Sequence, residues 1–387
     1  MKKKIVILGS TGSIGKTLIK LLKKNTNISI ELLTANKNYR ELLKQVKFFN
    51  VKNIIITDKK SYIKMKKKLD KKNINIFNNF NSLNKILNNK KIDYTMSSIS
   101  GMNGLHPTLE IIKFTKKIAI ANKEAIICGW SLIKNELKKN NAQFIPIDSE
   151  HFSIWSLINN AKNNDIEKVF LTASGGPFLN YKLNQFKFIN KKKALKHPNW
   201  KMGPKITIDS ATMMNKVFEI IEAKKIFDLN YDKLDIFIHP KSYVHALIKF
   251  NNGLTTFLIH DTNMTIPIFN SLYPNYQKKL KSKPLNLSIV NNLDFNKVNL
   301  KKFPIIKILD ELPKINSLFE TIVVTVNDNL VQQFLNEKIK FTDISKNLLK
   351  IISYKEFEKY KGITPKNIND ILELSKYVSL KMNTLSI

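Results

Sequence analysis

A glycine-rich turn between a short strand and a helix restricts the fold of this chain more than any other feature. The apolar residues 4–8 (KIVIL) precede Gly9-Ser10-Thr11-Gly12-Ser13-Ile14-Gly15, and helical spacing of Ile14 and Leu18 follows. Glycine lets the backbone turn tightly and approach a pyrophosphate, whose charge suits a helix N-terminus. GxxGxxG spacing also fits a plain strand-turn-helix connection. Its position between strand and helix favours a dinucleotide site.

Short apolar runs recur through the first part of the chain with helical stretches between them. After residues 4–8 they lie at 28–33, 53–57, 94–99, 118–121 and 143–147. Strands that alternate with helices at this spacing are typical of a parallel sheet with helices on both faces. The sequence therefore predicts an α/β protein whose residues 1–147 form a Rossmann-like, doubly wound, NADPH-binding domain.

The pattern changes after residue 147. Strand-like segments at 169–172, 205–208, 235–238, 245–250 and 255–259 are less regular, and helices are expected near 149–162 and 211–227. We predict a central α+β catalytic domain over 148–265. Residues 266–300 are rich in Pro and Asn and are predicted to be a linker. Helical periodicity over 301–387 predicts a C-terminal helical bundle.

The composition limits the classes of function. The formal net charge is +35, but the basic residues are lysines spread along the chain, with Arg40 as the single arginine. Arginine is preferred for reading bases, so a solvated surface is favoured over a specific nucleic-acid groove. No apolar run reaches the roughly 18 residues of a membrane span. The single cysteine, Cys128, excludes an intrachain disulfide and favours a reducing, cytoplasmic setting.

The end of the second predicted strand bears on the choice of coenzyme. NAD-binding folds commonly place a carboxylate there for the ribose 2′-hydroxyl. This chain has Asn36-Lys37-Asn38 instead, which would accept a 2′-phosphate, so NADPH is favoured over NADH. The alternative is an exposed turn that carries a lysine because the whole protein is lysine-rich.

Acidic residues in two segments indicate a metal site. Asp148-Ser149-Glu150 follows a predicted strand, and residues two apart in an extended segment point to the same side. Glu219 shares a helical face with Asn215 and Lys216. Oxygen ligands without a cysteine cluster favour magnesium or manganese, with cobalt as a further candidate. The alternatives are acids at a helix N-terminus and a surface Lys216–Glu219 ion pair.

Two serines and a histidine are candidates for binding a phosphate. Ser174 precedes Gly175-Gly176 after a predicted strand and offers a hydroxyl and backbone N–H groups. Ser210 is expected at the start of the Glu219 helix, as a phosphate ligand or only as a cap. His197 opens His-Pro-Asn-Trp, and Trp200 suggests a lid near 197–204. The alternative is an exposed loop pinned by one aromatic ring.

Seven segments together resemble the 1-deoxy-D-xylulose 5-phosphate reductoisomerase family of isoprenoid biosynthesis. They are GSTGSIG (9–15), ANKE (121–124), DSEH (148–151), ASGGPF (173–178), HPNWKMGPKI (197–206), DSATMMNK (209–216) and IHPKSYVH (238–245). The resemblance implies NADPH- and metal-dependent rearrangement and reduction of that substrate to 2-C-methyl-D-erythritol 4-phosphate by a homodimer. The chain departs from the family at Asn36, usually Gly, and at Asp328, usually Glu.

The resemblance also implies a role for each matched residue. Coenzyme-binding residues would be Thr11, Gly12, Ser13, Ile14, Asn36, Lys37, Asn38, Asn122, Glu124 and Gly203. The metal ligands would be Asp148, Glu150 and Glu219. Substrate-binding residues would be Lys123, Ser149, Glu150, Ser174, His197, Ser210, Asn215, Lys216 and Glu219. Lys123, Glu150 and His197 would act in catalysis.

Two other functions remain open at this stage. Another NADP-dependent oxidoreductase, acting on a small phosphorylated or semialdehyde substrate, would share the glycine-rich turn. Such enzymes commonly use a catalytic cysteine, and Cys128 lies outside the matching segments. A non-enzymatic protein that binds RNA or a membrane surface would explain the charge, but it would leave the motifs without a purpose.

Overall fold

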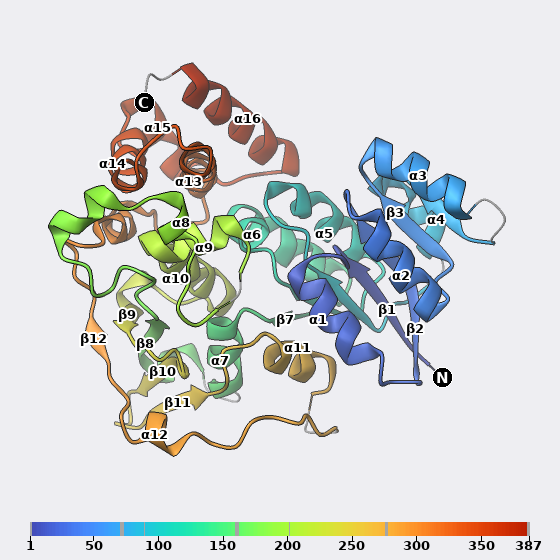
Figure 1. The fold of residues 1–387 in the computed structure, drawn as a ribbon, viewed down its shortest axis with the longest axis horizontal. Coiled ribbons are helices and arrows are strands. Elements are labelled where there is room, and N and C mark those ends of the chain that lie inside the picture. Colours follow the sequence, from blue (N-terminus) through green and yellow to red (C-terminus); the bar gives the residue numbers. More distant parts are fainter. Residues whose placement is uncertain are drawn as a thin grey trace. The chain divides into compact units, whose positions relative to one another are not determined.

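The computed structural model of the protein describes residues 2–69, 73–88, 90–158, 162–200, 202–274 and 278–384. The chain divides into two compact units, drawn in sequence colours in Figure 1. The first unit comprises Met1–Ile126, Ser131–Asp148 and Met264–Leu280, and the second comprises Ile127–Trp130, Ser149–Asn263 and Lys281–Ile387. No helix among the described residues is long and apolar enough to cross a membrane.

Within the described residues, the first unit contains a seven-stranded parallel sheet in the order β4-β3-β2-β1-β5-β6-β7. The strands are β1 (Lys3–Leu8), β2 (Ile28–Ala35), β3 (Asn53–Ile56), β4 (Asn75–Phe77), β5 (Tyr94–Ser97), β6 (Lys117–Ile120) and β7 (Gln143–Pro146). The six predicted strands are confirmed, and only the short β4 was missed. The Rossmann-like sheet follows from these continuous apolar runs, because parallel strands are buried on both faces.

Helices between the strands complete this unit (Figure 1). They are α1 (Ser13–Leu22), α2 (Tyr39–Phe49), α3 (Lys59–Leu69), α4 (Leu83–Leu87), α5 (Leu105–Ile112) and α6 (Lys123–Lys139). A later helix, α11 (Thr265–Leu272), also belongs here. Ser271 hydrogen-bonds the buried Tyr94 hydroxyl at 2.8 Å, and Leu272 lies in the sheet's core. The first part of the predicted linker 266–300 is therefore a buried helix.

The second unit contains a mixed sheet of five strands among its described residues, in the order β11-β10-β8-β9-β12. The strands are β8 (Ile166–Ala173), β9 (Leu234–Ile238), β10 (Val244–Phe250), β11 (Thr255–Ile259) and β12 (Asn296–Lys297). Strands β8 and β9 are parallel and the other pairs are antiparallel. Four of these strands were predicted. Strand β12 lies in the segment predicted to be a linker.

The helices of the second unit correct one prediction from the sequence. They begin with α7 (Ser149–Leu157), α8 (Lys191–Ala194), α9 (Pro204–Thr212), α10 (Met214–Phe227) and α12 (Leu287–Val290). Residues 205–208 were expected to form a strand because Ile206 and Ile208 alternate with polar residues. They lie in α9 instead, since Pro204 at the first helical position is preorganised for a helix.

A second correction concerns the start of the helix that carries Glu219. Met213 has φ of 72°, a left-handed conformation, and it separates α9 from α10. Helix α10 therefore begins at Met214. Ser210 lies inside α9, so the predicted capping role of Ser210 at the Glu219 helix is wrong.

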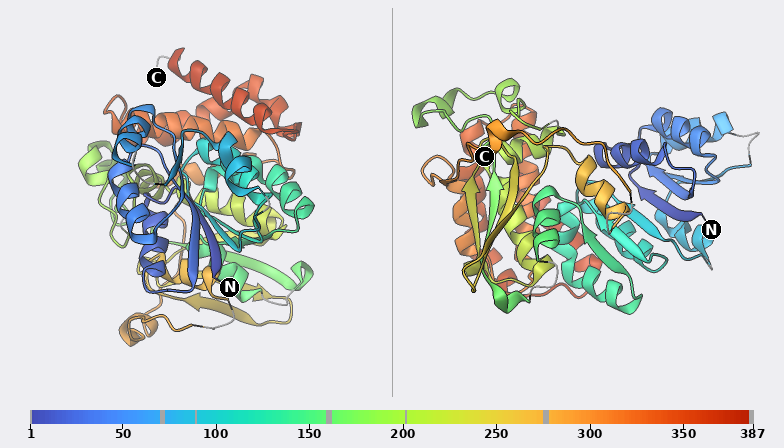
Figure 2. Two further views of the ribbon diagram at one scale, coloured as in Figure 1. Left: turned by 90° about the vertical axis from the view of Figure 1, so that its right-hand side faces the viewer. Right: turned by 90° about the horizontal axis from the view of Figure 1, so that it is seen from below.

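The C-terminal part of the second unit is helical, as predicted. Figure 2 shows α13 (Phe319–Leu335), α14 (Phe341–Ile352), α15 (Lys355–Glu358) and α16 (Ile368–Thr384) gathered in orange and red. A buried ion pair ties this group to α10, because Lys225 Nζ lies 2.8 Å from a carboxylate oxygen of Glu320. A 3₁₀ segment, η6 (Pro304–Glu311), also contacts α10 and α14.

Candidate active site

The glycine-rich turn of the first unit needs glycine at two positions. Gly9 has φ of 80°, and a Cβ there would lie 2.8 Å from the Ser98 carbonyl oxygen. A Cβ on Gly15 would lie 2.4 Å from the Gly9 carbonyl oxygen. Helix α1 follows with exposed Gly12 as its N-cap and exposed Ser13 as its first residue. The turn thus presents the N-terminus of α1 at a point where a pyrophosphate could approach the backbone.

Residues 36–38 lie at the exposed end of β2. Asn36 Nδ2 donates to Thr57 Oγ1 at 2.7 Å, and Asn38 Oδ1 accepts from the Glu41 backbone N–H at 3.2 Å. Asn38 is the N-cap of α2. Both amides therefore shape the turn, and Lys37 stands between them with an exposed side chain.

The side-chain amide of Asn122 is fully hydrogen-bonded within the protein. Its Nδ2 donates to the carbonyls of Ile99 (2.6 Å) and Gly101 (2.8 Å), and its Oδ1 caps α6 by accepting from the Ala125 N–H at 3.1 Å. Asn122 therefore fixes the loop after β5 to the start of α6. Any contact with a coenzyme would have to use its backbone or the surface it shapes.

Lys123 and Asp148 meet at the C-terminal edge of the first sheet. Lys123 is the first residue of α6, directly beyond β6, and Asp148 follows the neighbouring β7. Their side chains form an ion pair, and Lys123 is nearly buried. Parallel strands bring these two distant residues to one edge, which is where open α/β sheets bind ligands. Glu124, the next residue, is also buried.

In the second unit, Glu150 and Glu219 converge on the buried ammonium of Lys216. Lys216 Nζ lies 3.1 Å from Glu150 Oε1 and contacts Glu219 Oε2, and it donates to the Thr172 carbonyl at 2.5 Å. Burial acts to lower the Lys216 pKa, but the two carboxylates outweigh it and the pKa is raised. Lys216 therefore stays charged, and its three N–H donors all point to acceptors in the protein.

Further hydrogen bonds orient these two carboxylates. Asn215 Nδ2 donates to Glu219 Oε1 at 2.5 Å, and Ser149 Oγ donates to Glu150 Oε2 at 2.5 Å. His151 Nε2 hydrogen-bonds the backbone carbonyl of Glu219 at 2.9 Å. Two carboxylates held around one positive centre fit a hard divalent cation, and the described part of the chain places no cysteine in this group. The sequence did not single out His151, whose place between α7 and α10 becomes visible only in the fold.

Ser174, His197 and Ser210 form a hydroxyl–imidazole cluster in the same unit. His197 Nε2 lies 3.2 Å from Ser174 Oγ and 3.0 Å from Ser210 Oγ. The backbone N–H groups of Asn199 and Trp200 both donate to His197 Nδ1, at 3.2 and 2.9 Å. The proton of the neutral ring is therefore on Nε2, which faces the two hydroxyls. Burial lowers the His197 pKa to about 4, so the ring is neutral at pH 7.

The segment after His197 is tied to the turn that follows β9. Asn199 Nδ2 donates to the Pro240 carbonyl at 2.7 Å and to Ser242 Oγ at 2.9 Å. The Trp200 ring meets the His245 ring edge-on, with centroids 6.1 Å apart. Trp200, which belongs to the predicted lid, thus packs against a defined neighbour outside the lid. Lys201, also in that lid, lies outside the described residues.

Two buried histidines stack behind Trp200. The rings of His245 and His260 lie 3.7 Å apart at 18°, and His245 Nε2 hydrogen-bonds the His260 carbonyl at 3.1 Å. Burial, with help from the His260 side chain, lowers the His245 pKa to about 3. This packing gives His245 a structural role in the second unit. No motif in the sequence pointed to His260.

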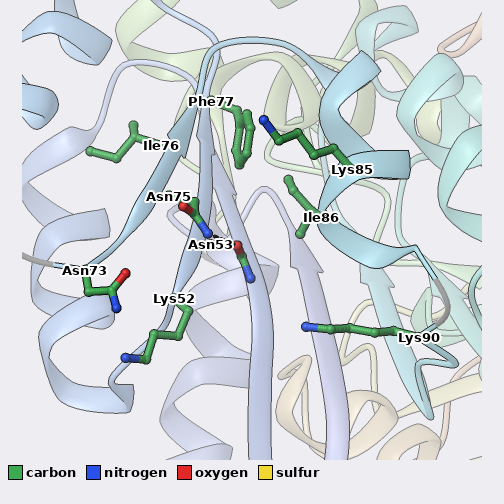
Figure 3. A pocket seen from close by; sticks show the side chains of 9 residues that line it. All are labelled: Lys52, Asn53, Asn73, Asn75, Ile76, Phe77, Lys85, Ile86 and Lys90. Atoms are coloured by element: carbon green, nitrogen blue, oxygen red, sulfur yellow. Dashed lines mark hydrogen bonds between the residues drawn. The ribbon is translucent and has the colours of Figure 1, made fainter.

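A separate pocket of about 550 Å³ lies in the first unit (Figure 3). It lies beside the N-terminal ends of β3 and β4, whereas the glycine-rich turn follows the C-terminal end of β1. Its polar lining consists of Lys52, Asn53, Asn73, Asn75, Lys85 and Lys90. Asn75 donates to Asn53 Oδ1, and Lys90 pairs with Glu31. None of the residues predicted for the active site lines this pocket.

Comparison with known protein families covers most of the chain. Residues 5–129 match the family model described as 1-deoxy-D-xylulose 5-phosphate reductoisomerase. Residues 144–227 match the C-terminal domain of that enzyme, and residues 260–379 match a second model described as DXP reductoisomerase C-terminal domain.

Individual relatives agree with these matches. The 1-deoxy-D-xylulose 5-phosphate reductoisomerase of Pelagibacter ubique is 62% identical over 387 residues, which is 100% of each chain. That of Sulfurihydrogenibium sp. is 36% identical, over 96% of this chain and 98% of its own.

Solved structures show the same fold. The Zymomonas mobilis enzyme in complex with NADPH is 27% identical, with a TM-score of 0.87 over 100% of both chains. A DOX-P reductoisomerase in complex with NADPH, fosmidomycin and magnesium is 31% identical, with a TM-score of 0.89 over 98% of this chain and 97% of that one. The sequence relatives and the shared fold lead to one conclusion: this chain belongs to the 1-deoxy-D-xylulose 5-phosphate reductoisomerase family.

Proposed function

We infer that this chain catalyses the NADPH- and divalent-metal-dependent rearrangement and reduction of 1-deoxy-D-xylulose 5-phosphate to 2-C-methyl-D-erythritol 4-phosphate. The observation that carries this inference is the convergence of Glu150 and Glu219 on one positive centre in a member of this family. Related enzymes have been solved with NADPH, fosmidomycin and magnesium. A dehydrogenase of another class would not need these two oriented carboxylates.

NADPH is proposed to bind along the glycine-rich turn of the first unit and to supply the hydride. The open N-terminus of α1 at Gly12 and Ser13 suits its pyrophosphate, with Thr11 and Ile14 beside it. Lys37 is proposed to meet the 2′-phosphate, because its exposed ammonium lies just beyond β2, where NAD-binding folds commonly place a carboxylate. The remaining assigned coenzyme residues are Asn36, Asn38, Asn122, Glu124 and Gly203.

A magnesium or manganese ion is proposed to be held by Glu150 and Glu219, with Asp148 as the third ligand from two positions before Glu150 in the chain. When bound, such an ion polarises substrate oxygens and stabilises negative charge on them. Asn215 and Ser149 orient the two carboxylates, as their 2.5 Å hydrogen bonds indicate. The oxygen-only donor set supports a hard cation over zinc.

The substrate's phosphate is proposed to bind the hydroxyl–imidazole cluster of Ser174, His197 and Ser210. Neutral His197 donates from Nε2 and the two hydroxyls add donors, while the backbone N–H of Gly176 donates to Ser174 Oγ at 3.1 Å and orients that hydroxyl. Asn215 and Lys216 are also proposed to reach the substrate's phosphate end, for which each would exchange a carboxylate partner for a phosphate oxygen. Lys123 and Ser149 are proposed to hold the carbon skeleton, and Lys123 to assist proton movement.

The domain roles and the oligomeric state belong to the same proposal. Residues 1–147 would bind NADPH, 148–265 would bind metal and substrate, and 301–387 would support them. A homodimer is supported by β11, an edge strand of the second sheet among the described residues, where Phe257 is 45% exposed and Leu254, just before the strand, is 62% exposed. An apolar edge strand is a site where a second chain can pair. The proposed compartment is the cytoplasm.

One assay tests this function. Purified protein is mixed with 1-deoxy-D-xylulose 5-phosphate, NADPH and Mn²⁺, and NADPH absorbance is followed. We expect oxidation that needs both metal and substrate. Glu219→Gln should lower kcat/KM by roughly a thousandfold, because a metal ligand contributes several kcal/mol to transition-state stabilisation.

NADPH affinity of the Glu219→Gln variant, measured by fluorescence, should match that of the wild-type protein. No metal-dependent oxidation by the wild type would refute the proposed function. Normal turnover by Glu219→Gln, with wild-type activity present, would refute only the metal assignment.

A further inference from the structure

A buried hydrogen bond joins α13, one of the C-terminal helices, to α9, the helix that carries Ser210. Asn327 on α13 donates from Nδ2 to Asp209 Oδ1 on α9 at 2.8 Å. Asn327 is fully buried and Asp209 is 2% exposed. A buried carboxylate is costly unless it is paired and hydrogen-bonded, so this contact strongly favours one placement of α9 against α13.

Lys205 extends this contact into a small network. Its Nζ lies 3.2 Å from Asp209 Oδ2, one helical turn along α9, and 2.9 Å from Asp328 Oδ1 on α13. The same ammonium lies 5.2 Å from the ring centroid of Phe218 on α10. Three helices therefore share one cation, at a place where Lys205 and Asp328 are about one-third exposed.

Helix α9 carries a residue of the hydroxyl–imidazole cluster. It starts directly after the predicted lid, and Ser210 follows Asp209 in the chain. The loop bearing Ser174 lies tightly against the end of α9, because a Cβ on Gly176 would be 2.9 Å from the Ser210 carbonyl oxygen. The two backbones are therefore packed too closely for a side chain to fit between them. A rotation or shift of α9 would therefore change the distances from Ser210 to His197 and Ser174.

We propose that α13 is a positioning element for substrate binding, in which Asn327 and Asp328 hold α9 through Asp209 and Lys205 so that Ser210 stays in register with His197 and Ser174. The proposal rests on the assignment of the hydroxyl–imidazole cluster to the substrate's phosphate. It gives the C-terminal helices a role in affinity for the phosphorylated substrate, beyond adding to the hydrophobic core.

A swap of donor and acceptor tests the proposal. Asn327→Asp places two buried carboxylates against each other, and we expect KM for 1-deoxy-D-xylulose 5-phosphate to rise roughly tenfold or more. Asp209→Asn combined with Asn327→Asp restores a donor and an acceptor in reversed order. The double variant should bring KM back to within about threefold of wild type. KM for NADPH should change less than KM for the substrate throughout, because only one of the assigned coenzyme residues, Gly203 at the N-cap of α9, adjoins this helix.

A milder variant and a control cover the case in which Asn327→Asp does not fold. Asp328→Asn removes only the partly exposed pair with Lys205 and should raise the same KM by about two- to threefold. Asn329→Ala removes one hydrogen bond to the Thr325 carbonyl within α13 and one to Ser379 on α16, and neither involves α9. It should lower the melting temperature at unchanged KM.

These measurements distinguish a failure of the positioning role of α13 from a failure of the phosphate assignment. If Ser210→Ala raises KM for the substrate but Asn327→Asp and Asp328→Asn change only the melting temperature, the positioning role is refuted and the phosphate site stands. A double variant that folds but does not recover KM also refutes it. If Ser210→Ala leaves KM unchanged, the phosphate assignment itself is wrong.

Discussion

His151 Nε2 donates a hydrogen bond to the backbone carbonyl of Glu219 at 2.9 Å, with the imidazole fully buried. A carbonyl only accepts, so the proton is on Nε2. His151 lies on α7 next to Glu150, and Glu219 lies on α10. The bond therefore joins the two helices whose carboxylates are proposed to hold the metal.

We predict that His151→Leu weakens metal binding more than it weakens the fold. Removal of a group that orients metal ligands typically costs 10- to 100-fold in metal affinity, and we expect a loss of about that size. The lost hydrogen bond should also cost about 0.5–1.5 kcal/mol in the free energy of unfolding, because the Glu219 carbonyl lies inside α10 and keeps its helical partner. Activity measured against Mn²⁺ concentration gives the first quantity, and urea unfolding gives the second.

The matched control for this variant is His239→Leu. It removes another buried imidazole bond, 2.9 Å to the Asp294 carbonyl, away from both carboxylates. His239→Leu should destabilise the protein and leave the Mn²⁺ dependence unchanged. Equal Mn²⁺ dependence in the two variants would show that His151 has no special role in orienting the ligands.

Protonation of His197 should make stability depend on pH. Burial lowers its pKa to about 4 from an ordinary 6.5, so between these values the unfolded chain binds a proton that the folded chain does not. The stabilising contribution is complete above pH 6.5 and is lost as the pH falls towards 4. His197→Gln should therefore flatten the fall in the free energy of unfolding between pH 6.5 and 4, measured by urea unfolding at several pH values.

The control for this pH dependence is His106→Gln, at an exposed histidine on α5. We expect its profile to follow the wild type. A His197→Gln profile as steep as the wild-type profile would mean that other groups cause the loss of stability in acid. His245, whose pKa burial lowers to about 3, would then be the next histidine to replace.

Dimerisation should depend on the exposed edge strand β11. Phe257→Glu adds a charge to an apolar edge, which natural proteins use to block pairing of edge strands. Sedimentation at micromolar concentration should show a dimer for the wild type and a monomer for Phe257→Glu. Leu380→Glu, at a 57% exposed leucine on α16, is the matched control and should remain dimeric. A Phe257→Glu dimer would place the interface elsewhere.

The sequence predicts the first unit well because each buried parallel strand is a continuous apolar run. The segment 205–208 shows where this reasoning fails. Ile206 and Ile208 alternate like strand residues, but Pro204 starts a helix and the buried contacts of α9 with α10 and α13 decide the outcome. Such long-range packing has no local signal. The error also displaced the predicted start of the helix that carries Glu219.

Local sequence patterns also fail to report long-range contacts in the candidate active site. Residues in dense motifs, such as Ser174 and Glu219, could be proposed from their neighbours in the chain. His151 and Asn327 could not, because each acts through a partner more than 60 residues away. Their side chains are ordinary until the fold places them against Glu219 and Asp209. Positioning residues of this kind are therefore the part of a site that sequence patterns miss.

The preference of the enzyme for NADPH over NADH should depend on Lys37. Its ammonium is exposed beyond β2, while Asn36 and Asn38 are engaged with Thr57 and the start of α2. Lys37→Ala removes one charge-assisted contact to a 2′-phosphate, worth about 1.5–3 kcal/mol, so kcat/KM for NADPH should fall roughly 10- to 150-fold. The value for NADH should stay the same. Lys60→Ala, at an exposed lysine of α3, should change neither coenzyme, and an equal fall for both coenzymes in Lys37→Ala would refute the assignment.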